Sequence, residues 1–380
     1  MTKVKKIIWF GILVFIILNL SIFIVTRKSY FLRKFDPVSL GELYTNSQYV
    51  IGDRSVGGIG DDGLYAFAGY YYFFQQGDIS SVNFEHPPLG KYLIGLSIYL
   101  FQNENVINLV YFVLLLVTTY FLALKLTQNK IISILSVSIL SINPLLLDHL
   151  IRSQLDLPFT LFFILALYTF ICSLDRYKLI FISSLFWGLA FATRFFPVLI
   201  PIEVYLLYFI IRHERKMLKS YLISLLIIPL IYLVSHISFF IYHPSLHEFI
   251  RHKIWMLSWY RGSPISIGNI WRNIFTGEYI DPAGKLVANE HWNVRLPVII
   301  TLSLIPFLQK KVRNQLPIRI AYYLNLFLLL YVTFFTTGVQ KYIMPVYPIT
   351  SILAVRSLSF FWCIIDPCVK VIISKSKVKS

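Results

Sequence analysis

The sequence predicts an all-α polytopic membrane protein with about ten transmembrane helices. Composition is the first of three observations that support this class. Of 380 residues, 57% are hydrophobic and only 14% are charged, which is too apolar for a soluble protein. The second observation is that apolar runs such as 7–25, 107–124 and 221–241 are close to or above the length that a helix needs to cross a bilayer. The third is the distribution of basic residues, described below.

The first apolar run follows Lys3, Lys5 and Lys6 but lacks a small-residue cleavage site. It is therefore expected to be a retained transmembrane helix and not a signal peptide. An even number of spans places both termini on one side of the membrane. The ten expected spans are 7–26, 107–125, 131–147, 156–174, 178–195, 197–211, 220–241, 296–308, 317–337 and 343–364.

The segment Leu89–Phe101 is apolar but too short to be an eleventh span. At 1.5 Å per residue, its helix would be only about 20 Å long. The hydrocarbon core of a bilayer is roughly 30 Å thick. We therefore expect a juxtamembrane helix at the outer face, within the first loop.

Basic residues agree with this topology. The segments placed in the cytoplasm contain 19 of the 35 lysines and arginines, as the positive-inside rule requires. If 89–101 crossed the membrane, most of these basic residues would lie outside. The exception is a group that follows the first span on the outer side and that either binds lipid head groups or simply flanks the helix: Arg27, Lys28, Arg33 and Lys34.

Three regions are expected. Residues 1–241 form a transmembrane catalytic module that includes the outer loop 27–106, residues 242–295 form a second outer loop, and residues 296–380 form the last helices and a basic cytoplasmic tail. No glycine motif for nucleotides is present, and no basic–aromatic stripe indicates nucleic-acid binding. The three cysteines are Cys172, Cys363 and Cys368, and they have neither disulfide-framework nor metal-site spacing.

Asp61 and Asp62 are the first candidates for chemistry, because adjacent carboxylates in the outer loop can shift one another's pKa. A carboxylate at the membrane face can accept the proton of a hydroxyl nucleophile. The competing interpretation is a solvated turn, since the segment reads Gly-Asp-Asp-Gly. An aromatic surface helix is expected over 64–76.

A Glu-His pair in a stiff Pro-Pro segment follows, as Glu85 and His86, and Lys91 begins the short helix. These residues either bind substrate or anchor the segment at the interface with snorkelling charges. Further along, Arg152 and Asp156 lie in the next outer connection. Asp156 is a second outer carboxylate, although it is also a favoured N-cap for the helix that follows.

Cations at the outer edge of later spans complete the candidates. Arg194 ends the fifth span, and Lys341 and Tyr342 precede the tenth. They could neutralise a phosphate or simply snorkel. A histidine metal site at His243, His247 and His252 is disfavoured, because Pro244 breaks the spacing and no carboxylate completes a set.

Taken in order, these elements resemble the GT-C superfamily of integral-membrane glycosyltransferases. The chain is most similar to protein O-mannosyltransferases and aminoarabinose–lipid A transferases, and so looks like glycosyltransferase family 39. The resemblance covers most of the chain and depends on the order of five short elements. They are Asp61-Asp62, His86-Pro-Pro-Leu-Gly-Lys91, Arg152-Ser-Gln-Leu-Asp156, the segment 188–194, and Lys341-Tyr-Ile-Met-Pro-Val-Tyr-Pro348.

The resemblance implies an inverting transfer of a sugar, with mannose one candidate, from a polyprenyl or dolichyl phosphate to an acceptor hydroxyl. Asp61 would be the general base, and Asp62, Asp156 and Glu85 would orient the acceptor or tune Asp61. Charge on the lipid phosphate would be neutralised by Arg152, Arg194, Lys341 and His86. Some members of the superfamily need a divalent cation, but O-mannosyltransferases generally do not. The resemblance therefore favours a reaction without a cofactor and leaves a divalent cation as the alternative.

Two departures from the family pattern matter. Asp62 stands where the family usually has Glu, and the sequence stops after the tenth expected helix, without the further helices or soluble domain of larger members. The acceptor, whether protein, glycan or lipid, is therefore left open. One alternative is lipid-linked glycan elongation or lipid modification by the same chemistry. A non-enzymatic polyprenyl-lipid transporter is the other. The expected location is the plasma membrane, with the active site outside.

Overall fold

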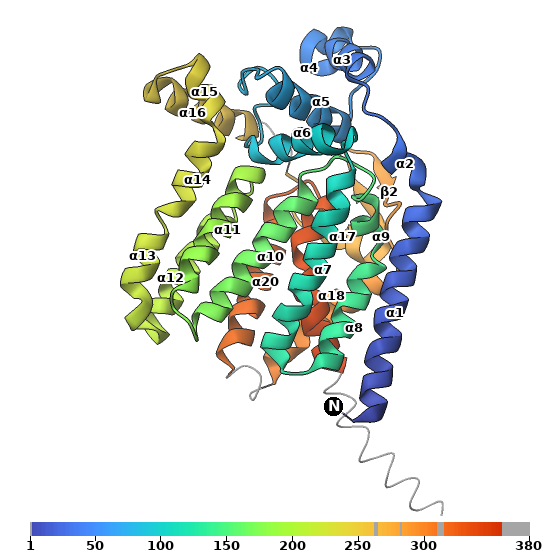
Figure 1. Ribbon diagram of the computed structural model, residues 1–380, viewed down its shortest axis with the longest axis vertical. Helices are drawn as coiled ribbons and strands as arrows, with labels where there is room; N and C mark the ends of the chain where they lie inside the picture. The colour runs from blue at the N-terminus through green and yellow to red at the C-terminus, as the bar shows by residue number, and fades with distance from the viewer. Residues whose placement is uncertain (1, 262–264, 282, 310–314, 359–380) are drawn as a thin grey trace, which may run out of the picture.

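The computed structural model describes residues 2–261, 265–281, 283–309 and 315–358. Its helices form a bundle, and short helices lie across one end of it (Figure 1). We call that end the cap end; it is the end at which the first helix finishes. The bundle contains α1 (Lys3–Thr26), α7 (Val106–Thr127), α8 (Lys130–Ser141), α10 (Asp156–Ser173), α11 (Leu179–Thr193), α12 (Leu199–His213), α18 (Arg295–Leu304) and α20 (Leu316–Phe334).

Among the described residues, five helical segments are long and apolar enough to cross a membrane. They are Lys3–Thr26, Val106–Thr127, Asp156–Ser173, Arg215–Ser235 and Leu316–Phe334. Shorter apolar helices cover other expected spans, and residues 347–358 are helical in the tenth. The polytopic, all-α class is thus confirmed. The end of the tenth span, the tail 365–380, Cys363 and Cys368 lie outside the described residues.

Two of the expected spans are interrupted. The span expected over 131–147 divides at Asn143, whose side chain caps a separate short helix, α9 (Pro144–Asp148). The span over 220–241 divides into α13 (Leu218–Ser224), α14 (Ile227–Ser235) and α15 (Ile237–Tyr242), after the 3₁₀ turn η2 (Arg215–Met217). Pro229 explains the first of these breaks, because its ring would clash with the carbonyl of Leu225 in a continuous helix.

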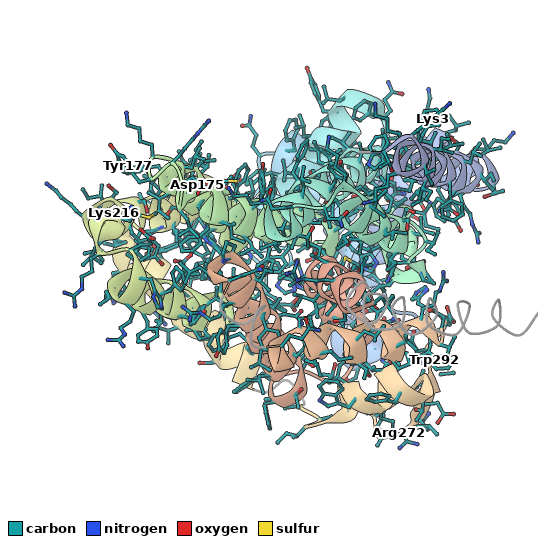
Figure 2. All side chains as sticks on the ribbon, turned by 90° about the horizontal axis from the view of Figure 1, so that it is seen from below. Lys3, Asp175, Tyr177, Lys216, Arg272 and Trp292 are labelled. Atoms are coloured by element: carbon teal, nitrogen blue, oxygen red, sulfur yellow. The ribbon has the colours of Figure 1, made fainter. Side chains whose placement is uncertain are left out.

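The end of the bundle opposite the cap carries exposed polar side chains. Figure 2 views this end and labels Lys3, Asp175, Tyr177 and Lys216 on it. Asp175 forms an ion pair with Lys125 near the end of α7. These residues belong to segments that the sequence analysis expects in the cytoplasm. The expected cytoplasmic segments therefore lie at the end of the bundle opposite the cap.

The cap is formed by the first loop. Its elements are α2 (Lys28–Leu32), α3 (Pro37–Thr45), α4 (Gln48–Ile51), the 3₁₀ turn η1 (Gly52–Arg54), α5 (Asp61–Phe74) and α6 (Leu89–Phe101). The short helix expected over 89–101 is therefore present and lies in the cap (Figure 1). The Gly-Asp-Asp-Gly turn interpretation is wrong: both aspartates belong to the first turn of α5, where carboxylates favour the positive end of the helix dipole.

The helices α5 and α6 pack closely through two glycines. A Cβ atom on Gly95 would lie 2.5 Å from the carbonyl oxygen of Gly69 and 2.5 Å from Cβ of Phe73. A Cβ on Gly69 would lie 2.7 Å from the carbonyl oxygen of Lys91. No side chain fits at either position, so this contact fixes how α5 presents its first turn.

We therefore expect Gly95→Ala to destabilise the cap by about 1–3 kcal/mol, the usual cost of overpacking. The measurement is thermal unfolding of the detergent-solubilised protein. Gly11→Ala in α1 is the matched control, because nothing lies within 4 Å of its added Cβ. Equal stability of the two variants would contradict the close contact between α5 and α6.

The second loop adds α16 (Leu246–Arg261), α17 (Asn269–Thr276) and an antiparallel hairpin of β1 (Glu278–Ile280) and β2 (Leu286–Ala288). Two asparagines of α17 hold the chain before the last helix. Asn269 donates a 2.7 Å hydrogen bond to the carbonyl of Thr337, and Asn273 donates a 2.9 Å bond to that of Gly338. The 3₁₀ helices η3 (Ile305–Leu308) and η4 (Gln340–Val346) complete the fold.

Candidate active site

The central feature at the cap end is an ion pair between Asp61 and Lys341, which are far apart in the sequence. Asp61 lies in the first turn of α5, and Lys341 lies in η4, directly after the segment that α17 holds. The Nζ atom of Lys341 contacts Oδ2 of Asp61, and both side chains are partly exposed. The first loop and η4 thus meet at a carboxylate that a ligand can reach.

Opposing effects act on the pKa of Asp61. Burial raises it, whereas the charge and hydrogen bond of Lys341 and the charge of Arg194 lower it, and the net pKa lies below its usual value. Asp61 is therefore ionised at neutral pH and is ready to accept a proton. Loss of the Lys341 charge would move this pKa upward.

A second ion pair lies behind the first and is buried. Arg194 follows α11 as its C-cap, and its Nη1 contacts Oδ1 of Asp156, the first residue of α10. Only 3% of Arg194 and 1% of Asp156 are exposed. The guanidinium also lies 5.2 Å from the centre of the Tyr342 ring. The expected N-cap role of Asp156 is wrong, because its carboxylate pairs with Arg194 and Leu155 occupies the N-cap position.

His149 extends this buried pair. Its Nε2 lies 3.9 Å from Oδ2 of Asp156, and its Nδ1 lies 2.9 Å from the carbonyl oxygen of Leu145. Burial lowers the pKa of His149 to about 3, so the ring is neutral. We infer that Asp156 and His149 hold Arg194 in place and do not themselves exchange protons with a ligand.

The Glu-His segment forms another side of the site. His86 Nδ1 lies 3.0 Å from the hydroxyl of Tyr260, which also donates a 2.8 Å bond to the carbonyl of Glu85. Burial, together with the charges of Arg194, Lys91 and Lys341, lowers the pKa of His86 well below its usual value. The expectation that His86 supplies a positive charge is therefore wrong; it offers a neutral imidazole.

Glu85 and Lys91 play different parts in the same segment. Lys91 is fully buried, and its Nζ donates to the carbonyl oxygens of Asn83 and of His86, the latter at 2.8 Å. It therefore anchors the loop, and the structure gives it no exposed atoms for a ligand. Burial raises the pKa of Glu85, and the negative charge of Asp61 raises it further. The positive charge of Lys91 lowers it, but the net pKa lies above its usual value.

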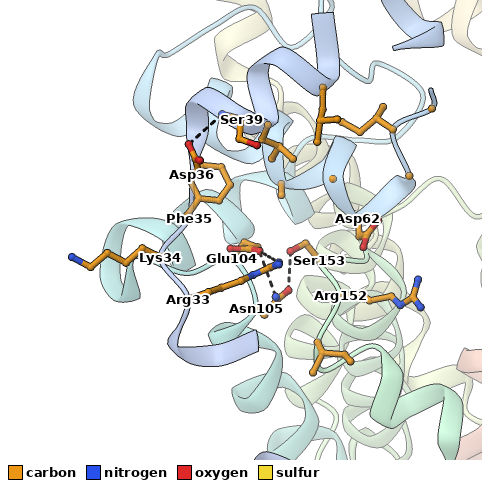
Figure 3. A pocket seen from close by; sticks show the side chains of 18 residues that line it. Arg33, Lys34, Phe35, Asp36, Ser39, Asp62, Glu104, Asn105, Arg152 and Ser153 are labelled. Carbon is orange, nitrogen blue, oxygen red and sulfur yellow. Dashed lines mark hydrogen bonds and ion pairs between the residues drawn. The ribbon is translucent and has the colours of Figure 1, made fainter. Parts of the chain in front are cut away.

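Asp62 and Arg152 face a different space from Asp61. Both line a polar cavity of about 480 Å³, whose lining does not include Asp61 (Figure 3). Arg152 also pairs with Asp148 at 2.9 Å. The structure therefore brings together Asp61, Asp156, Glu85, His86, Arg194, Lys341 and Tyr342. Asp62 lines the polar cavity instead, and Arg152 lines both that cavity and a smaller one that contains Lys341.

A smaller cavity lies beside the ion pair. It has a volume of about 290 Å³, and its lining includes Lys341, His149, Arg152 and the hairpin residue Tyr279.

His149 and Tyr260 are residues of the site that the sequence analysis did not select. No local signal marks Tyr260, which is one of many aromatic residues in the second loop. Among the described residues, no group of three or more His, Cys, Asp or Glu side chains is arranged to hold a metal ion.

Comparisons with known proteins agree with this architecture. Residues 85–239 match the family described as dolichyl-phosphate-mannose-protein mannosyltransferase. The crystal structure of ArnT from Cupriavidus metallidurans bound to undecaprenyl phosphate superposes with a TM-score of 0.60 at 15% identity, covering 91% of this chain and 60% of that chain. The chain has a GT-C fold.

Two further structures share this GT-C fold. Apo ArnT from the same organism has a TM-score of 0.59 at 13% identity and covers 79% of this chain and 55% of that chain. The apo Archaeoglobus fulgidus oligosaccharyltransferase has a TM-score of 0.53 at 12% identity, with coverages of 93% and 52%. The chain thus spans 52–60% of the length of these proteins. No curated protein matches the sequence.

Proposed function

We propose that the chain is a glycosyltransferase that moves a sugar, with mannose the first candidate, from a polyprenyl or dolichyl phosphate to an acceptor hydroxyl. The observation that carries this proposal is the ion pair between Asp61 and Lys341 at the end of a membrane bundle. A carboxylate beside a cation at the cap end of the bundle supports a general base next to a group that neutralises a phosphate. The family match over 85–239 and the undecaprenyl phosphate bound by ArnT support the donor class.

The acceptor hydroxyl oxygen attacks the anomeric carbon, and its proton passes to the Asp61 carboxylate. The bond between the anomeric carbon and the phosphate oxygen breaks, and the lipid phosphate leaves with the bonding electrons. Attack opposite the leaving group inverts the anomeric centre. When the donor binds, Lys341 leaves its ion pair with Asp61 and contacts the donor phosphate. Asp61 is then free to act as the base, and the charge of Lys341 neutralises the leaving phosphate.

Arg194 and His86 have supporting roles in this reaction. Arg194 is paired with Asp156, so it does not form the main phosphate contact. Its charge still acts on the site, since it lowers the pKa of Asp61. Because the Tyr260 hydroxyl donates to the carbonyl of Glu85, the neutral His86 donates from Nδ1 to the Tyr260 oxygen, and its Nε2 is free to accept a hydrogen bond from a hydroxyl group of the substrate. Lys341 is thus the cation that the reaction depends on most.

Replacing Lys341 with methionine is expected to lower kcat by about 10²–10³-fold, the typical loss when one group that stabilises a developing anion is removed. The acid limb of the pH–rate profile should also move to higher pH, because the pKa of Asp61 rises without its partner. In both proteins, activity falls as pH drops through the pKa of Asp61, since the protonated carboxyl cannot act as a base.

Two variants control this experiment. Lys341→Arg keeps the charge and should retain much of the activity, and Lys285→Met removes an exposed lysine of the hairpin turn and should change nothing. An unchanged acid limb in Lys341→Met would contradict the pairing of Lys341 with the catalytic base.

The donor class is tested with the purified chain in lipid nanodiscs and a panel of radiolabelled sugars on polyprenyl phosphate, mannose included. Label should pass from the lipid fraction to a water-soluble, protein or glycan fraction. The same sugars supplied on nucleotides should give no transfer. If instead the lipid-linked sugar crosses the membrane of a proteoliposome chemically unchanged, the chain is a transporter and not a transferase.

A further inference from the structure

The polar cavity that holds Asp62 has the features of a ligand site in its own right (Figure 3). Its volume of about 480 Å³ lies within the roughly 300–1,000 Å³ typical of small-molecule sites. Four chain segments build it: 33–43 with α3, 58–66 with the start of α5, 104–105 before α7, and 151–153 before α10. The two aspartates at the start of α5 thus have different surroundings. Asp61 forms the ion pair with Lys341, whereas Asp62 lines this cavity.

Glu104 supplies a buried polar group in the cavity lining. It is only 6% exposed, and its Oε1 forms an ion pair with Arg33. Its other carboxylate oxygen, Oε2, is buried and has no hydrogen-bond partner among the described residues. Ser153 and Asn105 lie beside it and are joined by a 3.0 Å bond from the serine hydroxyl. A buried carboxylate oxygen without a donor is costly, and a ligand hydroxyl would satisfy it.

The charges of the cavity select against strongly ionic ligands. Three basic side chains and three acidic ones line it: Arg33, Lys34, Arg152, Asp36, Asp62 and Glu104. A phosphate would meet the carboxylates, and a cation would meet the guanidinium groups. A neutral ligand with many hydroxyl groups can donate to the carboxylates and accept from the basic groups at once. Phe35 adds an aromatic ring to the same lining.

The polar cavity and the smaller cavity beside the ion pair share one lining residue. Arg152 lines both this cavity and the smaller one that contains Lys341. Lys341 in turn pairs with Asp61. A ligand in the polar cavity therefore lies next to the proposed base, separated from it by the first turn of α5.

We propose that this cavity binds a saccharide, the carbohydrate part of the acceptor that receives the transferred sugar. This assignment rests on the proposed transferase function. Within it, Asp62, Glu104, Ser153 and Arg152 bind hydroxyl groups of the acceptor, and Asp61 deprotonates the one that reaches it.

The test is binding of the full-length protein, labelled and held in nanodiscs, to an array of immobilised oligosaccharides. Ser39 is an exposed residue of α3 that lines the cavity, so Ser39→Trp should fill its mouth without disturbing the buried groups. We expect the wild type to bind a subset of the array and Ser39→Trp to bind those sugars at least about tenfold more weakly. Glu248→Gln, remote on α16, is the control and should bind as the wild type does.

Glu104→Gln provides a second variant that keeps the shape of the side chain. It should weaken the same interactions, since the carboxylate oxygen that accepts from the ligand is lost. Absence of binding by the wild type, or equal binding by wild type and Ser39→Trp, would overturn the saccharide site. Retention of anionic lipid by the wild type and its loss in Ser39→Trp, without saccharide binding, would assign the cavity to a lipid head group instead.

Array binding is independent of catalysis, so the two proposals fail separately. One outcome is that the wild type binds saccharides, Ser39→Trp abolishes this binding, and no sugar is transferred from any lipid donor. That outcome would support the binding site and overturn the transferase function. Sugar transfer that Ser39→Trp leaves unchanged would keep the transferase and overturn this acceptor site.

Discussion

Replacing Asp61 with asparagine is expected to lower the rate of sugar transfer by about 10²–10⁴-fold, the usual contribution of a general base. Asparagine keeps the size of the side chain but cannot take the proton of the acceptor hydroxyl. The measurement is single-turnover transfer from the lipid donor in nanodiscs. Donor binding should persist, because Lys341 loses its competing partner and remains free for the phosphate.

Asp62→Asn is the matched control for this experiment, since it changes the adjacent carboxylate in the same helical turn. Asp62 faces the polar cavity, so its variant should raise KM for the acceptor and change kcat little. If Asp62→Asn reduced kcat as strongly as Asp61→Asn, the assignment of Asp61 as the base would be wrong.

The second large effect concerns stability. Asp156→Ala would leave the guanidinium of Arg194 buried without its partner, in a site where only 3% of Arg194 is exposed. Breaking a buried ion pair in this way typically costs about 3–5 kcal/mol. We expect a large fall in Tm of the detergent-solubilised protein, together with loss of activity.

The comparison is Asp175→Ala, which breaks the exposed pair with Lys125 at the opposite end of the bundle. Exposed pairs contribute about 0–1 kcal/mol, so its Tm should hardly move. Equal losses in the two variants, or no loss in Asp156→Ala, would show that Arg194 and Asp156 are not a buried pair.

The membrane architecture could be read from the sequence because one physical constraint dominates it. Apolar run length predicted the positions of the bundle helices, and the 13 residues of α6 were recognised as too short to cross. The two interruptions were missed. Pro229 and the Asn143-Pro144 pair were both visible signals of a break, but hydropathy averages over them.

The sequence predicted which residues lie at the candidate site, at one end of the molecule. It did not predict which of them contact one another. Pairing of Asp61 with Lys341, or of Asp156 with Arg194, depends on how helices distant in the sequence pack together. Residue type alone misled the prediction for Lys91. This lysine was expected to bind substrate, but it donates hydrogen bonds to backbone carbonyls in its own loop.

The separation of Asp61 from Asp62 had a signal that could have been used. Adjacent residues on a helix of 3.6 residues per turn point about 100° apart, so two neighbouring carboxylates cannot face one site equally. Aspartates directly before an apolar, aromatic run are typical of a first helical turn. Assigning them to a turn hid this divergence.

The most direct test of the mechanism is the anomeric configuration of the transferred sugar, determined by proton NMR on the product of a donor of known configuration. Direct attack by a hydroxyl that Asp61 deprotonates predicts a product of the opposite configuration to the donor. A product with retained configuration would mean either two displacements through a covalent intermediate or attack on the face that the phosphate leaves, and both would contradict direct opposite-face attack by a hydroxyl that Asp61 deprotonates.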